Sequence, residues 1–202
     1  MSEEKDKVGG EKQPKDQIES QASGWLSLRR PPAILDSIRR LFESPKKLIG
    51  PFVKNGQVVA DLGCGSGYYT LALAELVGPE GKVYAVDLGK KCIRALEKKA
   101  DKVGYHNIEA HASSASDMSF IKDRSVDFVL ANGLLCSMAE HRQSAVNEIK
   151  RILKPRGQAY LSLGFPPPLG FVGREEWEKI LEGFKVKRRG DSLEKWAVVF
   201  VK

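Results

Sequence analysis

From residue 57 onward, short runs of apolar residues alternate with longer segments in which apolar residues recur every three or four positions. The short runs have the length of buried strands, and the longer segments have the period of helices that bury one face. We expect strands at 57–62, 82–86, 107–112, 126–130, 158–163, 185–189 and 195–201. We expect helices at 68–77, 90–103, 140–153 and 174–184, and an earlier amphipathic helix at 33–43 that Ser44-Pro45 ends.

Strands that alternate with helices predict βαβ units and a parallel sheet. Right-handed crossovers then place helices on both faces of that sheet. The last two strands are joined only by a turn at residues 190–192, which is too short for a parallel crossover, so these strands must be antiparallel. The expected fold class is therefore α/β: a doubly wound, Rossmann-like sheet of seven strands, mostly parallel with one antiparallel strand near the edge.

The length of the chain and the distribution of its polar residues indicate three parts. The 202 residues fit one domain of ordinary size. Residues 1–20 carry almost no large apolar side chains, so we expect a disordered charged tail there. We expect residues 21–50 to form an N-terminal helical cap and residues 51–202 to form the main domain.

The charge of the chain is basic, with a formal net charge of +7. Acidic residues outnumber basic ones within residues 1–20, so the remainder of the chain is more basic still. Such a surface can bind an anionic partner such as RNA, a phosphorylated metabolite or a membrane surface. It can equally be a lysine-rich face that only interacts with solvent.

The three cysteines, Cys64, Cys92 and Cys136, form no CxxC pair, and their odd number argues against a disulfide framework. We expect reduced thiols and no metal site. No apolar run approaches the ~18 residues of a membrane span, and the N-terminal residues lack the apolar region of a secretory signal. These features predict a cytoplasmic protein without a transmembrane segment.

The first expected strand runs directly into a glycine-rich loop, because residues 61–68 read DLGCGSGY. Glycines let the backbone turn tightly and let a ligand approach, and ligands bind at the carboxyl ends of strands in open α/β sheets. Tyr68 stands where a dinucleotide fingerprint needs its third glycine, and the Lys-Ser or Lys-Thr pair of a P-loop is missing. The carboxylate of Asp61 suits a ligand with an ammonium group better than a pyrophosphate.

The second expected strand ends in Asp87. An acidic residue at this position can accept hydrogen bonds from both hydroxyl groups of a ribose. The ligand should therefore combine a ribose with an ammonium-bearing part. S-adenosylmethionine has both, so it is the predicted cofactor.

With these residues in place, the chain resembles the class I S-adenosylmethionine-dependent methyltransferases over roughly residues 50–202. The order and spacing of five segments carry the resemblance, and they are closest to the small-molecule (type 11) subgroup that includes ubiquinone and menaquinone biosynthesis methyltransferases. The segments are VVADLGCGSGYYT (58–70), VYAVDL (83–88), SSASDMSF (113–120), SVDFVLANGLL (125–135) and EIKRILKPRGQAYLSL (148–163).

The resemblance implies that Asp61 and the backbone of residues 63–67 hold the methionine part of the cofactor. It implies that Asp87 binds the ribose hydroxyls and that Leu88 packs on the adenine. Cys64 fits a small residue that fills the loop, and Tyr68 and Tyr69 fit residues that pack around the cofactor.

The resemblance also places Ser114 and Ala115 at the adenine edge, although Ser114 stands where many relatives have an aspartate. Asn132, just past the fourth strand, would face the reacting centre. The expected cofactor-binding residues are Asp61, Gly63, Cys64, Gly65, Gly67, Tyr68, Asp87, Leu88, Ser114, Ala115 and Asn132.

The sequence assigns no catalytic residue. His111 and His141 are candidates for a general base, but they also fit a strand-end residue near the cofactor and a solvated helix residue. Cys136 lies near the expected acceptor side, but Leu135 precedes it, whereas a cysteine nucleophile of the cytosine-C5 type would want a Pro-Cys pair.

The resemblance implies methyl transfer to an acceptor, and a small molecule is favoured because the chain has no inserted recognition domain. The basic surface keeps open an RNA- or protein-modifying methyltransferase. A cofactor-binding partner protein without activity is a third possibility. Residues 131–134 read ANGL and lack the Asn-Pro-Pro-Tyr or Asp-Pro-Pro-Tyr of amino-methyltransferases. The loop at 164–171 is either a rigid connector or a lid over the acceptor.

Overall fold

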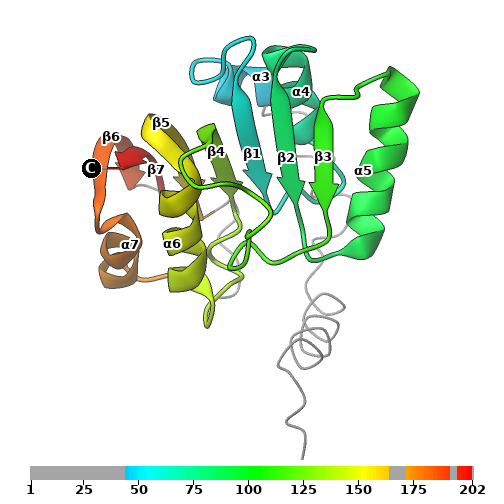
Figure 1. Ribbon diagram of the computed structural model, residues 1–202. Coiled ribbons are helices and arrows are strands. Elements are labelled where there is room, and N and C mark those ends of the chain that lie inside the picture. Colours follow the sequence, from blue (N-terminus) through cyan, green and yellow to red (C-terminus); the bar gives the residue numbers. More distant parts are fainter. Residues whose placement is uncertain (1–43, 164–171, 192–194, 202) are drawn as a thin grey trace, which may run out of the picture. The chain divides into compact units, whose positions relative to one another are not determined.

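The computed structural model describes residues 44–163, 172–191 and 195–201 (Figure 1). The expected tail at 1–20, most of the expected cap with its helix at 33–43, and the loop at 164–171 lie outside the described residues. The helices are α3 (Pro45–Ile49), α4 (Thr70–Val77), α5 (Lys90–Val103), α6 (Arg142–Ile152) and α7 (Arg174–Leu181). The strands are β1 (Val58–Leu62), β2 (Lys82–Val86), β3 (Ile108–His111), β4 (Val126–Asn132), β5 (Leu153–Ser162), β6 (Phe184–Asp191) and β7 (Lys195–Val201).

The seven strands form one sheet in the order β3-β2-β1-β4-β5-β7-β6. The first five strands pair in parallel, whereas β7 is antiparallel to both of its neighbours, β5 and β6. This confirms the doubly wound α/β sheet with one reversed strand near the edge. From β1 the chain moves outward to β2 and β3 and then crosses to β4, so the topological switch point lies between β1 and β4.

Helices cover both faces of this sheet, with α6 and α7 on one face and α3 and α4 on the other (Figure 1). Side chains alternate between the faces along each strand. On β4, Val129 packs into the cluster that contains Ile149 of α6, whereas Phe128 packs into the cluster that contains Leu73 of α4. Burial on both faces explains why the central strands read as continuous apolar runs.

The structure corrects several expected boundaries. The strand expected at 126–130 extends to Asn132, so this residue ends β4 rather than following it. The strand expected at 158–163 begins earlier, at Leu153, and its register against β4 shifts between the pairs Val126–Leu153 and Phe128–Gln158. The structure also adds a short helix that was not expected, α3, which begins at Pro45 because proline is well tolerated in the first turn. The helix at 33–43 that Ser44-Pro45 was expected to end lies outside the described residues.

The remaining helices keep their expected positions, and three of them are shorter than expected. The helices α4, α6 and α7 lose one or more residues at an end, while α5 agrees with the expected range 90–103. Within the ranges that the structure describes, no helix combines the length and the apolar composition that a membrane span requires.

Candidate functional site

The residues expected to bind a cofactor lie at one edge of the sheet, where the parallel strands end. Asp61 lies on β1 and pairs with Ala85 of β2 and Leu130 of β4. Asp87 follows β2 directly, and Asn132 is the last residue of β4. Because β2, β1 and β4 are neighbours in the sheet, their carboxyl ends bring these three side chains to one place.

The carboxylate of Asp87 is turned toward the glycine loop. Its Oδ2 accepts a hydrogen bond of 2.9 Å from the backbone N–H of Gly65, and its Oδ1 accepts one of 2.7 Å from the backbone N–H of Gly89. A Cβ atom at Gly89 would lie 3.0 Å from Oδ1, so the glycine leaves room for this turn of the carboxylate. The end of β2 is therefore joined directly to the loop that follows β1.

The N–H groups of the glycine loop are largely used inside the protein. Those of Gly63 and Cys64 donate to the carbonyl of Val86 (2.8 and 3.1 Å), and that of Gly67 donates to the carbonyl of Cys64 (3.0 Å). The N–H of Gly65 donates to Asp87, as described above. Among the described residues, the carbonyl of Gly63 accepts no hydrogen bond. The carbonyl of Gly65 accepts only a long one from the Cys64 thiol, at 3.6 Å.

This distribution of donors and acceptors determines which ligands fit. A phosphate group at a helix N-terminus needs free N–H groups, whereas this loop offers mainly carbonyl oxygens. The nearby carboxylates of Asp61 and Asp87 would also repel an anion. A ligand that carries an ammonium group, a positive charge on sulfur and two ribose hydroxyls supplies the matching donors and charges. The residues present therefore fit S-adenosylmethionine.

Asp61 is buried, with 3% of its surface exposed. The hydroxyl of Thr70, the first residue of α4, donates a hydrogen bond of 2.6 Å to its Oδ2. Burial raises the pKa of Asp61 to about 7; the Thr70 hydrogen bond opposes the rise, and the charge of Asp87 adds to it. A carboxylate in this state changes its charge near neutral pH. Thr70 was not expected from the sequence, because nothing in local spacing reveals a contact between a strand and the next helix.

Cys64 fills the loop as a buried residue. Burial raises the pKa of its thiol well above the ordinary value, and the charges of Asp61 and Asp87 raise it further. The thiolate is the reactive form of cysteine, so this thiol is inert near neutral pH.

The carboxyl end of β4 contacts the segment that follows the glycine loop. Asn132 Nδ2 donates a hydrogen bond of 2.9 Å to the hydroxyl of Tyr69, which is itself buried. Tyr68 packs edge-to-face on Tyr69, with ring centroids 5.1 Å apart. Leu134 lies over Gly63, where an added Cβ atom would meet its Cδ1 at 3.1 Å. Tyr69 was expected, with Tyr68, to pack around the cofactor, whereas Leu134 was not among the expected site residues.

The expected adenine side is built by the segment after β3. Ser114 is half-buried, and its hydroxyl is 2.7 Å from the hydroxyl of Ser116, while Ala115 is buried. Ser114 follows β3 and Asp87 follows β2, and these two strands are neighbours, so the strand order places the two residues near each other. No hydrogen bond among the described residues joins them. Leu88 is 43% exposed, which leaves an apolar side chain open beside Asp87.

A half-buried ion pair, which was not expected from the sequence, fixes the rest of this segment. Glu148 Oε2 accepts a hydrogen bond of 2.8 Å from the N–H of Met118. Arg151 donates to Glu148 and to the carbonyls of Met118 and Ile121, at distances of 2.6 to 2.8 Å. Arg151 also pairs with Asp123. Helix α6 thereby holds the segment that begins at Ser113.

Of the candidate catalytic residues, His111 and Cys136 make contacts within the protein, and His141 is exposed at the surface. His111 Nε2 is 2.7 Å from Glu109 Oε1, and its ring stacks on Phe120 at 3.8 Å. His141 is exposed at the position before α6. The thiol of Cys136 donates to the carbonyl of Gly133 at 2.9 Å. These contacts support structural roles for His111 and Cys136.

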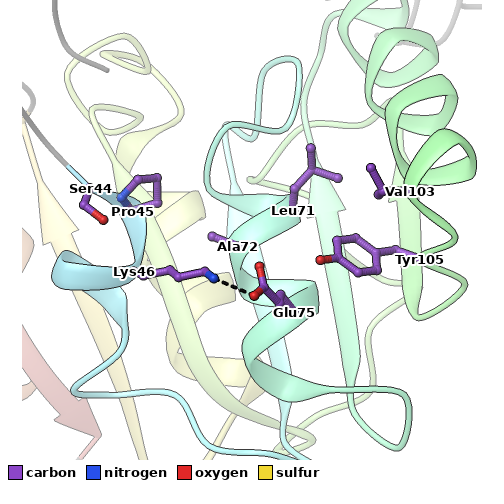
Figure 2. Close-up of a pocket in the computed structure, with 8 residues that line it drawn as sticks. All are labelled: Ser44, Pro45, Lys46, Leu71, Ala72, Glu75, Val103 and Tyr105. Atoms are coloured by element: carbon purple, nitrogen blue, oxygen red, sulfur yellow. Dashed lines mark hydrogen bonds and ion pairs between the residues drawn. The ribbon is translucent and has the colours of Figure 1, made fainter. Parts of the chain in front are cut away.

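A cavity of about 330 Å³ lies on the outer side of α4 (Figure 2). It is lined by Leu71 and Ala72 of α4, by Tyr105, and by an ion pair between Lys46 and Glu75 with an Nζ–Oε1 distance of 2.5 Å. It shares no residue with the expected cofactor-binding set. The candidate site is therefore assigned from the chemistry of the sheet edge and not from this cavity.

Comparison with known proteins identifies the family. The model of the methyltransferase domain family matches residues 53–164, which is more than half of the chain. The demethylmenaquinone methyltransferase of Geobacillus stearothermophilus is 34% identical over 105 residues, covering 52% of this chain and 44% of the relative. The enzyme of the same name from Bacillus velezensis is 33% identical over 120 residues, with 59% and 51% covered. The chain spans about half the length of these relatives.

Solved structures agree with this assignment. A SAM-dependent methyltransferase from Aquifex aeolicus superposes with a TM-score of 0.70 and 26% identity, covering 85% of this chain and all of that chain. A putative rRNA methylase from Clostridium thermocellum superposes with a TM-score of 0.67 and 25% identity, covering 77% of this chain and 92% of that chain. The chain therefore belongs to the class I S-adenosylmethionine-dependent methyltransferases.

Proposed function

We propose that this chain transfers the methyl group of S-adenosylmethionine to a small-molecule acceptor. The observation that supports the cofactor most directly is the acceptor-rich sheet edge. There the carboxylates of Asp61 and Asp87 lie beside a loop whose carbonyls at Gly63 and Gly65 are open. Such an edge favours a cationic ligand over a phosphate.

Most of the expected residues have a role in this proposal. Asp61 and the carbonyls of Gly63 and Gly65 hold the ammonium end, and Asp87 accepts hydrogen bonds from the ribose hydroxyls. Leu88 covers one side of the adenine. Ser114 and Ala115, whose segment α6 fixes, meet its edge.

Asn132 and Tyr68 line the side where the methyl group is transferred. The bound cofactor supplies a methyl group that is already activated by the positive charge on sulfur. The protein's task is then to place the acceptor in line with the bond that breaks, and such alignment can supply ~7–11 kcal/mol. This explains why the site needs no strong general base when the acceptor is a thiolate, a free amine or an enolate.

Two observations support a small and largely apolar acceptor. The relatives named above are demethylmenaquinone methyltransferases. The half-buried side chains that follow β4, Leu134 and Cys136, are uncharged, and Asn132 at its end is uncharged as well. An uncharged wall suits an acceptor with an apolar ring.

The test has two steps on the full chain. Isothermal calorimetry with S-adenosylmethionine measures binding, and transfer of a radiolabelled methyl group into fractionated small molecules and RNA of the native host identifies the acceptor. Label in a small-molecule fraction supports the proposal. Absence of calorimetric binding would refute the cofactor assignment, and label confined to RNA would refute the acceptor class.

A second candidate is an RNA-modifying enzyme, which the edge strand β6 favours. Lys185, Lys187 and Arg188 are exposed on it, and Arg189 pairs with Glu178 of α7. Because β6 lies three strand spacings from β4, about 14 Å, a nucleic acid along this edge could reach the site. RNA binding through these cations should weaken steeply as salt is raised, and salt-independent or undetectable RNA binding argues against this candidate.

Tight cofactor binding without transfer to any fraction would point instead to a non-catalytic, cofactor-binding partner protein. Among the described residues Cys64, Cys92 and Cys136 form no disulfide, which supports a reducing compartment, and we place the protein in the cytoplasm.

A further inference from the structure

Helix α5 contacts the glycine loop through two side chains on successive turns. Leu96 is fully buried and lies against Gly67, where an added Cβ atom would be 2.4 Å from its Cδ1. The ammonium group of Lys99 donates hydrogen bonds to the carbonyl oxygen of Ser66 at 2.7 Å and to its hydroxyl at 3.0 Å. One helix therefore touches two consecutive residues of the loop.

These contacts fix one peptide unit at both of its polar atoms. The carbonyl of Ser66 accepts from Lys99, and the N–H of Gly67 donates to the carbonyl of Cys64. The loop needs such contacts because glycines are conformationally permissive. Gly63, Gly65 and Gly67 all have positive φ, at 76°, 53° and 89°. With the Ser66–Gly67 unit held, the neighbouring carbonyl of Gly65 keeps the direction that leaves it open.

The same helix also begins at the other half of the site. The residue before α5, Gly89, donates its N–H to Asp87, and Lys99 reaches Ser66 from the third turn of the helix. Helix α5 is thus a rigid connection between the carboxylate after β2 and the loop after β1. A charged donor makes a stronger hydrogen bond than a neutral one, which gives Lys99 more effect on the loop than a neutral side chain would have.

We propose that Lys99 is a positioning residue of the cofactor site, which sets the orientation of the Ser66–Gly67 peptide and thereby the open carbonyl of Gly65. The inference rests on the proposed cofactor, and it adds a residue outside the glycine loop to the groups that determine affinity. Lys99 itself touches Ser66 and not the cofactor.

The test compares Lys99→Met with Lys98→Met. Both substitutions remove one positive charge from α5, but Lys98 is exposed and contacts no loop residue in the described structure. We expect Lys99→Met to raise the Kd for S-adenosylmethionine about 10-fold by calorimetry and Lys98→Met to leave it within 2-fold. Lys99→Arg keeps a charged donor and should recover most of the affinity.

A second measurement does not need the cofactor. Hydrogen exchange of the peptide that spans residues 63–70 in the free protein should become faster in Lys99→Met and remain unchanged in Lys98→Met. Equal affinity and equal exchange in the two variants would overturn the inference, as would a loss of affinity that Lys99→Arg fails to recover. If the unmodified chain does not bind S-adenosylmethionine, the proposed function fails, and the exchange measurement still decides whether Lys99 orders the loop.

Discussion

The carboxylate of Asp87 and the backbone N–H of Gly65 are hydrogen-bonded at 2.9 Å, although 22 residues separate them along the chain. The bond joins the end of β2 to the loop after β1. A second N–H, from Gly89, holds the other carboxylate oxygen at 2.7 Å. The carboxylate is therefore oriented by the protein itself before any ligand arrives, which lowers the ordering cost of binding.

Removing this carboxylate should weaken cofactor binding. For Asp87→Ala we expect a loss of about 2 kcal/mol, or ~30-fold in Kd for S-adenosylmethionine, because charged hydrogen bonds to the ribose are lost. Isothermal calorimetry measures the change. Asp101→Ala removes the same charge from an exposed position on α5 and serves as the control. An unchanged Kd in Asp87→Ala would contradict the ribose assignment.

The stability of the free protein should depend on the ionisation of Asp61. Its pKa rises from the ordinary value of 3.8 to about 7 because the carboxyl group is buried. The folded chain then binds the proton more tightly than the unfolded chain, so the contribution of this group to stability is full below pH 4 and is lost as the pH rises to about 7. Asp61→Asn cannot ionise. Denaturant titrations between pH 5 and pH 8 should show that the unmodified chain loses stability relative to Asp61→Asn as the pH rises. A difference in the free energy of unfolding that stays constant over this range would refute this prediction.

Cofactor affinity should change with pH in the opposite direction. An ammonium group binds the ionised form of Asp61, so the Kd for S-adenosylmethionine should fall as the pH rises from 6 to 8, through a pKa of about 7. Calorimetry at several pH values measures the profile. Asp61→Asn should bind weakly with a flat profile. An identical slope in both proteins would assign the effect to another group.

The ion pair between Glu148 and Arg151 should stabilise the segment that carries Ser114. Arg151→Met removes the charged donor from the carboxylate of Glu148 and from two backbone carbonyls. We expect the free energy of unfolding to drop by about 2 kcal/mol in denaturant titrations at pH 7. Arg94→Met, at an exposed position on α5, is the control and should change it by less than ~0.5 kcal/mol.

This contribution has its own pH dependence. Arg151 lowers the pKa of Glu148 below its ordinary value of 4.5. The stabilisation is therefore full above pH 4.5 and is lost as the pH falls below the lowered value. A difference between Arg151→Met and the unmodified chain that stayed constant as the pH was lowered from 7 through 4.5 to the acid limit of folding would contradict the ion pair.

The first part of β5, shortly after α6, contains a strained residue. Arg156 has a φ of 70°, in the left-handed region that favours glycine. Arg156→Gly should raise the free energy of unfolding by about 0.5–1 kcal/mol, since the left-handed region penalises residues with a Cβ atom. The control is Lys122→Gly, at an exposed loop position without positive φ, which should lower the free energy of unfolding. A lower melting temperature for Arg156→Gly would refute the strain.

Much of the fold follows from local patterns. The range of α5 agreed with its apolar period, and the reversed strand followed from the shortness of the turn before β7. The strand boundaries that were wrong lie where the local apolar pattern and the pairing between strands disagree. Asn132 extends β4 because it pairs with Ser162, a polar residue that no apolar run would have included. Helix α3 was not expected, because its five residues are too few to show an apolar period.

The class of fold and the family could be predicted from local pattern alone, because apolar period, glycine spacing and the order of motifs are properties of neighbouring residues. The same pattern placed Asp61, Asp87 and Asn132 at or next to strand ends. The contacts that these residues make are set by tertiary packing. The pKa of Asp61, the Asp87–Gly65 bond and the reach of Lys99 to Ser66 depend on burial and on distances between segments far apart in the chain. Such quantities arise when the strands pair and the helices pack, so no local pattern encodes them.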